Sequence, residues 1–102
     1  MENLNQTVAL IQKDFTLEAS DLPASIDSMD KLRIELNKVV SYLLDKDFNR
    51  LLNALYRIDV SEAKVKLILS EENPERLSLA LTDLIIKREL KKIETRKKYG
   101  PS

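Results

Sequence analysis

The sequence predicts an all-α protein folded as a compact bundle of about five helices. Glycine and proline are scarce, because the 102 residues include one glycine and three prolines, whereas a multi-stranded sheet needs such residues at its turns. Apolar residues recur at helical spacing along most of the chain. They make up 43% of it and charged residues 33%, so the chain can bury a core behind a polar surface. At this length we expect a single domain, residues 1–102.

Five helices are expected, the last the longest, over about residues 3–15, 28–45, 47–58, 60–70 and 74–98. In the first helix, Leu4, Val8 and Ile11 fall at spacings of four and three, which places them on one face. A loop is expected at residues 16–27, because Pro23 disfavours helical backbone at the residue before it. We expect this loop to be the most mobile part of the chain.

The second and third helices are expected to supply most of the core. Asp27 or Ser28 is a candidate cap for the second helix, and Asp47 for the third. Between these helices the sequence allows either a tight turn or a continuous, kinked helix. The apolar stripe of the second helix consists of Met29, Leu32, Leu36, Val39, Val40, Leu43 and Leu44. The predicted centre of the core consists of Phe48, Leu51, Leu52, Leu55 and Tyr56.

Capping motifs also mark the fourth and fifth helices. The residues from Asp59 to Glu62 have the spacing of a capping box, in which Asp59 would cap the fourth helix. Asn73 followed by Pro74 is typical of a helix start. Residues 99–102 include Gly100 and are expected to fray.

The corner between the third and fourth helices allows two interpretations. One is a recognition corner that presents Arg57 to a partner. The other, which we favour, is structural: Tyr56 packs, Asp59 caps a helix, and Arg57 pairs with a nearby carboxylate.

The composition argues against an enzyme and against cofactor or metal binding. The chain has neither histidine nor cysteine, so the commonest general base, the most reactive nucleophile and the usual transition-metal ligands are missing. Aspartate pairs such as Asp45 with Asp47 lack the glycine turn of a calcium loop and are interpreted as caps. No segment is apolar enough for a membrane span, and no signal peptide is recognisable. We therefore expect a cytoplasmic protein, and the sequence identifies no small-molecule substrate.

The last helix has apolar residues on two nearly opposite faces. One stripe contains Leu77, Ala80, Leu81, Leu84 and Ile85. The other stripe contains Leu79, Ile86, Leu90 and Ile93. Such a helix lies either in the middle of its own fold or between its domain and a second chain. The second alternative makes the second stripe a candidate interface, and the protein an interaction or scaffold module that forms a homodimer or binds a protein partner.

The C-terminal half of the same helix is strongly basic. Residues 87–98 include seven basic and two acidic side chains, a local charge of +5 in a chain with no net charge. The candidate contacts to an anionic partner are Arg88, Lys91, Lys92, Arg96, Lys97 and Lys98. These residues suggest an alternative function, a nucleic-acid-binding accessory protein. An acidic protein partner is also compatible with them, as is an ordinary solvated helix end, because the helix dipole favours cations there.

Overall fold

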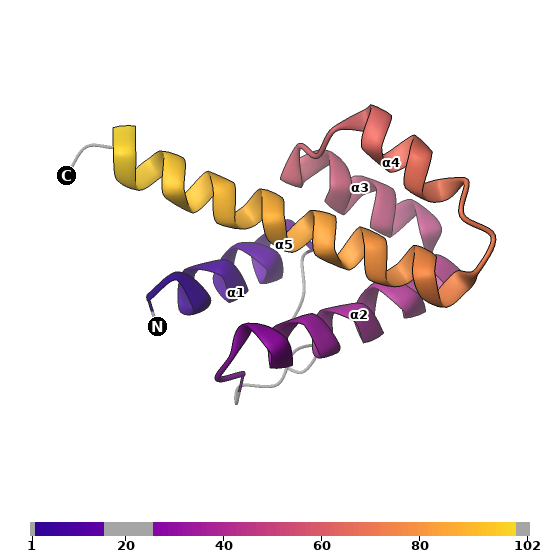
Figure 1. The fold of residues 1–102 in the computed structure, drawn as a ribbon, viewed down its shortest axis with the longest axis horizontal. Helices are drawn as coiled ribbons and strands as arrows, with labels where there is room; N and C mark the ends of the chain where they lie inside the picture. The colour runs from indigo at the N-terminus through magenta and orange to yellow at the C-terminus, as the bar shows by residue number, and fades with distance from the viewer. Residues whose placement is uncertain (1, 16–25, 100–102) are drawn as a thin grey trace.

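The computed structural model of the chain describes residues 2–15 and 26–99 (Figure 1). Within these ranges the fold is all-helical and contains no strand. The helices are α1 (Glu2–Asp14), α2 (Met29–Lys46), α3 (Phe48–Ile58), α4 (Glu62–Leu69) and α5 (Pro74–Tyr99). The predicted fold class is confirmed, and each boundary lies within two residues of its expected position. The predicted mobile loop lies almost entirely outside the described residues, as do residues 100–102.

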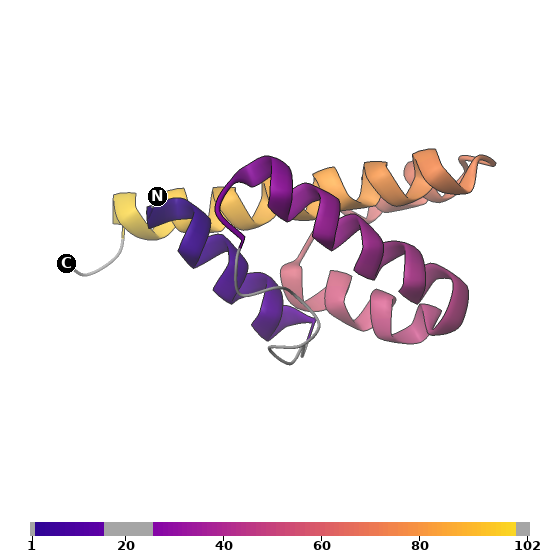
Figure 2. The same cartoon turned by 90° about the horizontal axis from the view of Figure 1, so that it is seen from below.

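Helix α5 runs along the length of the molecule and contacts each of the other four helices. Its C-terminal half lies over α1 and its N-terminal half over α2 (Figure 1). Seen from below, α5 runs across the upper part of the molecule, α1 and α2 slope away from it, and α3 lies farthest from it (Figure 2). The long last helix is therefore the element around which the bundle is organised.

The hydrophobic core is built by α1, α2, α3 and α5, with Phe15 just after α1. Its fully or nearly fully buried members are Leu4, Leu10, Ile11, Phe15, Leu32, Leu36, Val40, Leu43, Leu51, Ala54, Leu55, Ile58, Leu81, Ile85 and Ile93. Helix α4 contributes no buried residue and contacts α5 from the side. Four helices thus enclose the core, while α4 lies at its edge.

The structure corrects the predicted centre of the core on α3. The buried face of this helix consists of Leu51, Ala54, Leu55 and Ile58. Phe48 is 39% exposed and Tyr56 is 79% exposed, so the prediction that they belong to the core is wrong. The reason is that α1, α2 and α5 all contact α3, and together they cover a face that is rotated away from Phe48 and Tyr56.

Three of the expected helix caps are present. The Ser28 hydroxyl accepts a hydrogen bond of 3.1 Å from the Lys31 amide at the start of α2. The Asp47 carboxylate accepts one of 3.2 Å from the first turn of α3. Asp47 alone separates α2 from α3, so the tight turn is the alternative that the structure adopts. Asn73 Oδ1 accepts bonds of 2.9 and 3.2 Å from the first turn of α5. These side chains satisfy amides that have no partner within their helices.

The predicted capping box before α4 is wrong. Asp59 lies in the left-handed region, with φ of 64°, and ends α3 instead of starting α4. Ser61 caps α4, accepting a hydrogen bond of 3.3 Å from the Lys64 amide. The α3–α4 turn needs a residue with positive φ, and aspartate tolerates this region better than most residues. The turn therefore uses Asp59 and leaves the cap to Ser61.

Candidate interaction sites and a buried acidic pair

The second apolar stripe of α5 is divided between the core and the surface. Ile93 is only 2% exposed, and Ile86 is partly buried against the core. Leu79 and Leu90 are half-buried. A partner that binds this stripe would therefore contact mainly Leu79 and Leu90, because Ile93 already packs within the chain.

The most deeply buried line of α5 is centred between its two apolar stripes and includes members of both. It consists of Ser78, Leu81, Thr82, Ile85, Glu89 and Ile93. Three of these side chains are polar, so apolar spacing in the sequence does not reveal this face. The helix is thus buried along a line that mixes apolar and polar residues.

The first two polar residues on this line are hydrogen-bonded, Ser78 to α2 and Thr82 within α5. The Ser78 hydroxyl donates to the side-chain oxygen of Asn37 and lies 3.3 Å from its backbone carbonyl. The Thr82 hydroxyl donates to the Ser78 carbonyl at 2.8 Å. Nearby at the surface, Arg33 of α2 makes a two-point ion pair with Asp83, at 2.7 and 3.0 Å. The polar side chains at the α2–α5 contact therefore have partners, as buried polar groups normally do.

Glu89, further along the same line, has a different environment. It is fully buried, and Asp14, at the end of α1, is nearly so. The Lys92 ammonium lies 3.2 Å from Glu89 Oε1 and 3.5 Å from Asp14 Oδ2. Although Lys92 is this close, neither Glu89 oxygen has a hydrogen bond of acceptable geometry to any described residue. Two carboxyl groups therefore flank a single ammonium where α1 meets α5.

This environment raises the pKa of Glu89 from 4.5 to about 7. Burial is the main cause, because it disfavours the charged form, and the neighbouring Asp14 carboxyl raises the pKa further. Lys92 acts in the opposite direction and lowers the pKa. The net result is a buried carboxyl group that titrates near neutral pH.

Two arginines of α3 hold the C-terminal end of α1. Arg57 donates a hydrogen bond of 3.2 Å to the Asp14 carbonyl, and Arg50 donates one of 3.4 Å to the Phe15 carbonyl. Carbonyls at a helix end lack partners within the helix, and these cations satisfy them. Arg57 therefore has a structural role, although its acceptor is a backbone carbonyl and not the expected carboxylate. The expected packing of Tyr56 is wrong, since its ring is exposed.

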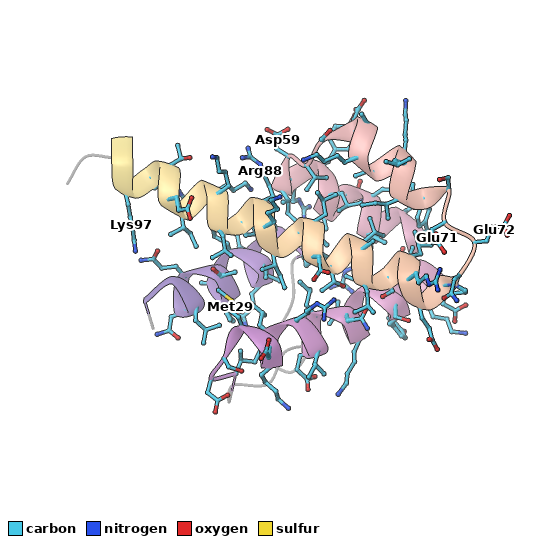
Figure 3. The ribbon with its side chains drawn as sticks, in the orientation of Figure 1. Met29, Asp59, Glu71, Glu72, Arg88 and Lys97 are labelled. Carbon is cyan, nitrogen blue, oxygen red and sulfur yellow. The ribbon has the colours of Figure 1, made fainter. Side chains whose placement is uncertain are left out.

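The basic residues of α5 fall into two groups. Arg88 lies 3.6 Å from the Asp59 carboxylate and donates to the Asp59 carbonyl at 3.1 Å (Figure 3), and Lys92 belongs to the acidic pair. Lys91, Arg96 and Lys97 are exposed. Lys97 lies at one end of the molecule, and Glu71 and Glu72 lie at the other end (Figure 3). The Lys98 side chain lies outside the described part. Two of the predicted contacts, Arg88 and Lys92, thus lie against the chain's own acids.

An apolar groove runs between α3 and α4, and part of its lining is the face of α3 that the sequence predicted to lie in the core. It has a volume of about 290 Å³, and its apolar lining is Leu52, Leu55, Tyr56, Val60, Val65 and Leu69. Leu69 also lines a neighbouring groove of about 880 Å³, together with Tyr42 and Phe48. Phe48, Leu52 and Tyr56 are spaced four residues apart, so they form one stripe along α3. We call the surface formed by this stripe and the facing Val65 and Leu69 the α3–α4 groove.

Among the described residues, no group of three or more histidine, cysteine, aspartate or glutamate side chains is placed to hold a metal ion. In the same part of the chain, no helix has the length and apolarity needed to cross a membrane. Comparison with protein-family models, curated proteins and solved structures finds no match to this chain.

Proposed function

We propose that this protein is a protein–protein interaction module that binds an apolar helical segment of a partner in the α3–α4 groove. The observation that carries the proposal is the open apolar stripe of α3, where Tyr56 is 79% exposed. Helix α4 flanks this stripe without burying any of its own residues. Contiguous exposed apolar surface of this kind, bordered by polar residues, is typical of interaction sites.

The dimensions of the groove suit a helix as its occupant. Phe48 and Tyr56 are eight positions apart, so the stripe is roughly 12 Å long at a rise of about 1.5 Å per residue. Amphipathic helices that bind grooves use anchors at positions i, i+3 or i+4, and i+7, which span about the same length. Tyr56 is suited to be an anchor, because tyrosine combines a large apolar ring with a polar hydroxyl.

The proposal is tested by selecting binders from a displayed library of amphipathic helical peptides. We expect the selected peptides to carry apolar residues at helical spacing and to shift the NMR signals of Leu52, Tyr56 and Leu69. Replacing Tyr56 with alanine should weaken binding by roughly tenfold or more, as loss of a central anchor does. The matched control is Ile34→Ala, since Ile34 is exposed on α2 and lines neither groove. Peptides that bind the Tyr56→Ala variant as tightly as the wild type would refute the proposal.

A second candidate function is contact with an anionic partner such as nucleic acid. It is supported by the exposure of Lys87, Lys91 and Arg96 on the basic half of α5. It requires an affinity for a short single-stranded or duplex oligonucleotide that falls steeply as salt is raised. The Lys91→Gln, Arg96→Gln double variant should reduce that salt dependence. Absence of binding at low salt would exclude this function.

A further inference from the structure

At the contact between α1 and α5, the net charge of a buried cluster depends on whether one carboxyl group is protonated. Asp14 and Glu89 both lie against the Lys92 ammonium, at 3.5 and 3.2 Å. If both acids are ionised, one positive charge faces two negative charges at a site from which water is almost excluded. If one acid is protonated, the cluster is neutral. Buried charge without compensation strongly disfavours a packed state.

We infer that α1 is a pH-sensitive helix, which packs firmly on α5 while the Glu89 carboxyl beside Asp14 holds a proton and is loosened when that proton leaves. The group that responds to pH is the buried Glu89 carboxyl, which lies beside Asp14 of α1. The other polar side chains on the buried line of α5, Ser78 and Thr82, are hydrogen-bonded. The inference is independent of the function proposed above, because the acidic pair does not line the α3–α4 groove.

The charged groups around Glu89 come from three helices. Asp14 belongs to α1 and Lys92 to α5, and these two act directly on the Glu89 carboxyl. Arg57 of α3 borders the cluster, because its carbonyl accepts a hydrogen bond of 3.4 Å from Lys92 and its guanidinium binds the Asp14 carbonyl. Lys92 therefore already donates to the Asp14 carboxylate and to the Arg57 carbonyl, and it cannot fully neutralise a second carboxylate.

The effect should be local to α1. This helix contacts α5 and α3, and Asp14 is its last residue. The packing of α2 on α3 and α5 relies on apolar residues such as Leu36, Leu51 and Leu81, which are fully buried and carry no charge. Local opening begins where packed contacts are fewest or least favourable. An unpaired charge at the α1–α5 contact should therefore release α1 before the rest of the bundle.

The direction of the pH effect follows from the titration of Glu89. Its pKa is about 7 in the folded protein and 4.5 for an ordinary glutamate, so between these values the docked state binds more protons than the undocked state. The contribution to docking is fully present below about pH 4.5 and is lost as the pH rises through about 7. Docking of α1 should therefore weaken on the alkaline side of neutrality.

The test is amide hydrogen exchange of the whole chain, with protection factors corrected for the intrinsic effect of pH. From pH 5.5 to 8.5 we expect the protection of α1 amides, such as Leu10 and Ile11, to fall by roughly tenfold or more. The protection of the α2 amides from Leu36 to Leu43 should fall much less. In Glu89→Gln, which keeps the shape of the side chain, α1 protection should not change with pH. The matched control is Glu94→Gln on the exposed side of α5, which should retain the wild-type pH dependence.

A second variant, Asp14→Asn, keeps the inference testable if Glu89→Gln proves unstable. It removes the negative charge beside Glu89, so it should also flatten the pH profile of α1. The inference is overturned if α1 protection in the wild type is independent of pH. It is also overturned if Glu89→Gln keeps the wild-type profile, or if α1 and α2 lose protection by the same factor.

Discussion

At the scale of single residues, buried polar groups distinguish the two ends of α5. Near its start, Ser78 and Thr82 are hydrogen-bonded within the α2–α5 contact. Further along, Glu89 is buried with neither oxygen hydrogen-bonded and depends on a single ammonium shared with Asp14. The first arrangement stabilises the fold at any pH, whereas the stability of the second depends on protonation.

Removal of the Lys92 side chain should therefore be more harmful at high pH than at low pH. In Lys92→Ala, two buried acids lose their common cation, and the loss of one partner of a buried ion pair typically destabilises a protein by about 3–5 kcal/mol. We expect a loss of this order at pH 8 and a smaller one at pH 5, where Glu89 is protonated. Urea unfolding at both pH values measures the difference. Lys91→Ala is the control, because this exposed residue should change stability by less than about 0.5 kcal/mol. Equal losses for Lys92→Ala at both pH values would contradict this account of the cluster.

At the scale of helices, local sequence and tertiary packing contribute differently to each element. Helices α2 and α4 both begin at a serine cap, with hydrogen bonds of 3.1 and 3.3 Å. Helix α2 then buries four leucine and valine side chains in the core, whereas α4 buries none. Similar caps thus begin one helix that is held by the core and one that is held only at its edge.

The two caps should accordingly affect stability in different ways. Replacing Ser28 with alanine should lower the free energy of unfolding of the whole protein by about 1 kcal/mol, as loss of a cap does. Replacing Ser61 with alanine should instead speed amide exchange in α4 and leave the global free energy of unfolding nearly unchanged, because α4 can open by itself. Chemical unfolding and hydrogen exchange of both variants test this. A large drop in global stability for Ser61→Ala would show that α4 unfolds together with the core.

At the scale of the whole molecule, α5 both organises the bundle and carries predicted contact residues. All four other helices contact it. Its buried line points into the bundle, and its two apolar stripes lie on either flank of that line. Leu90 is half-buried, whereas Ile93, less than one turn away, is in the core. Neighbouring members of one predicted interface therefore belong to different environments.

Polar substitutions on this stripe should separate folding from association. We expect Ile93→Asp to abolish the helical circular dichroism signal, because it buries a charge in the core. Leu90→Asp should retain that signal, since the new carboxylate can reach water. If the predicted homodimer forms through α5, light scattering should show a wild-type mass above the 11.7 kDa of one chain and a monomer for Leu90→Asp. A wild-type monomer at all concentrations would exclude that dimer and leave the α3–α4 groove as the candidate site.

The sequence by itself determined the helices. Their positions depend on apolar spacing and on caps such as Ser28, Asp47 and Asn73, and both signals act over a few residues. Which face of each helix is buried was decided only by the tertiary structure, because burial depends on the neighbours that a helix meets. Phe48 and Tyr56 illustrate this, since the other helices cover a different side of α3 and leave both residues at a groove.

The candidate sites follow the same division. The basic character of residues 87–98 is visible in the sequence, but the attachment of Arg88 and Lys92 to acids elsewhere in the chain is not. The acidic pair was missed entirely, because Asp14 and Lys92 are 78 residues apart and each is an ordinary charged residue in its own helix. Only the packing of α1 on α5 removes water from these side chains. This loss of hydration is the main reason that the pKa of Glu89 is raised to about 7.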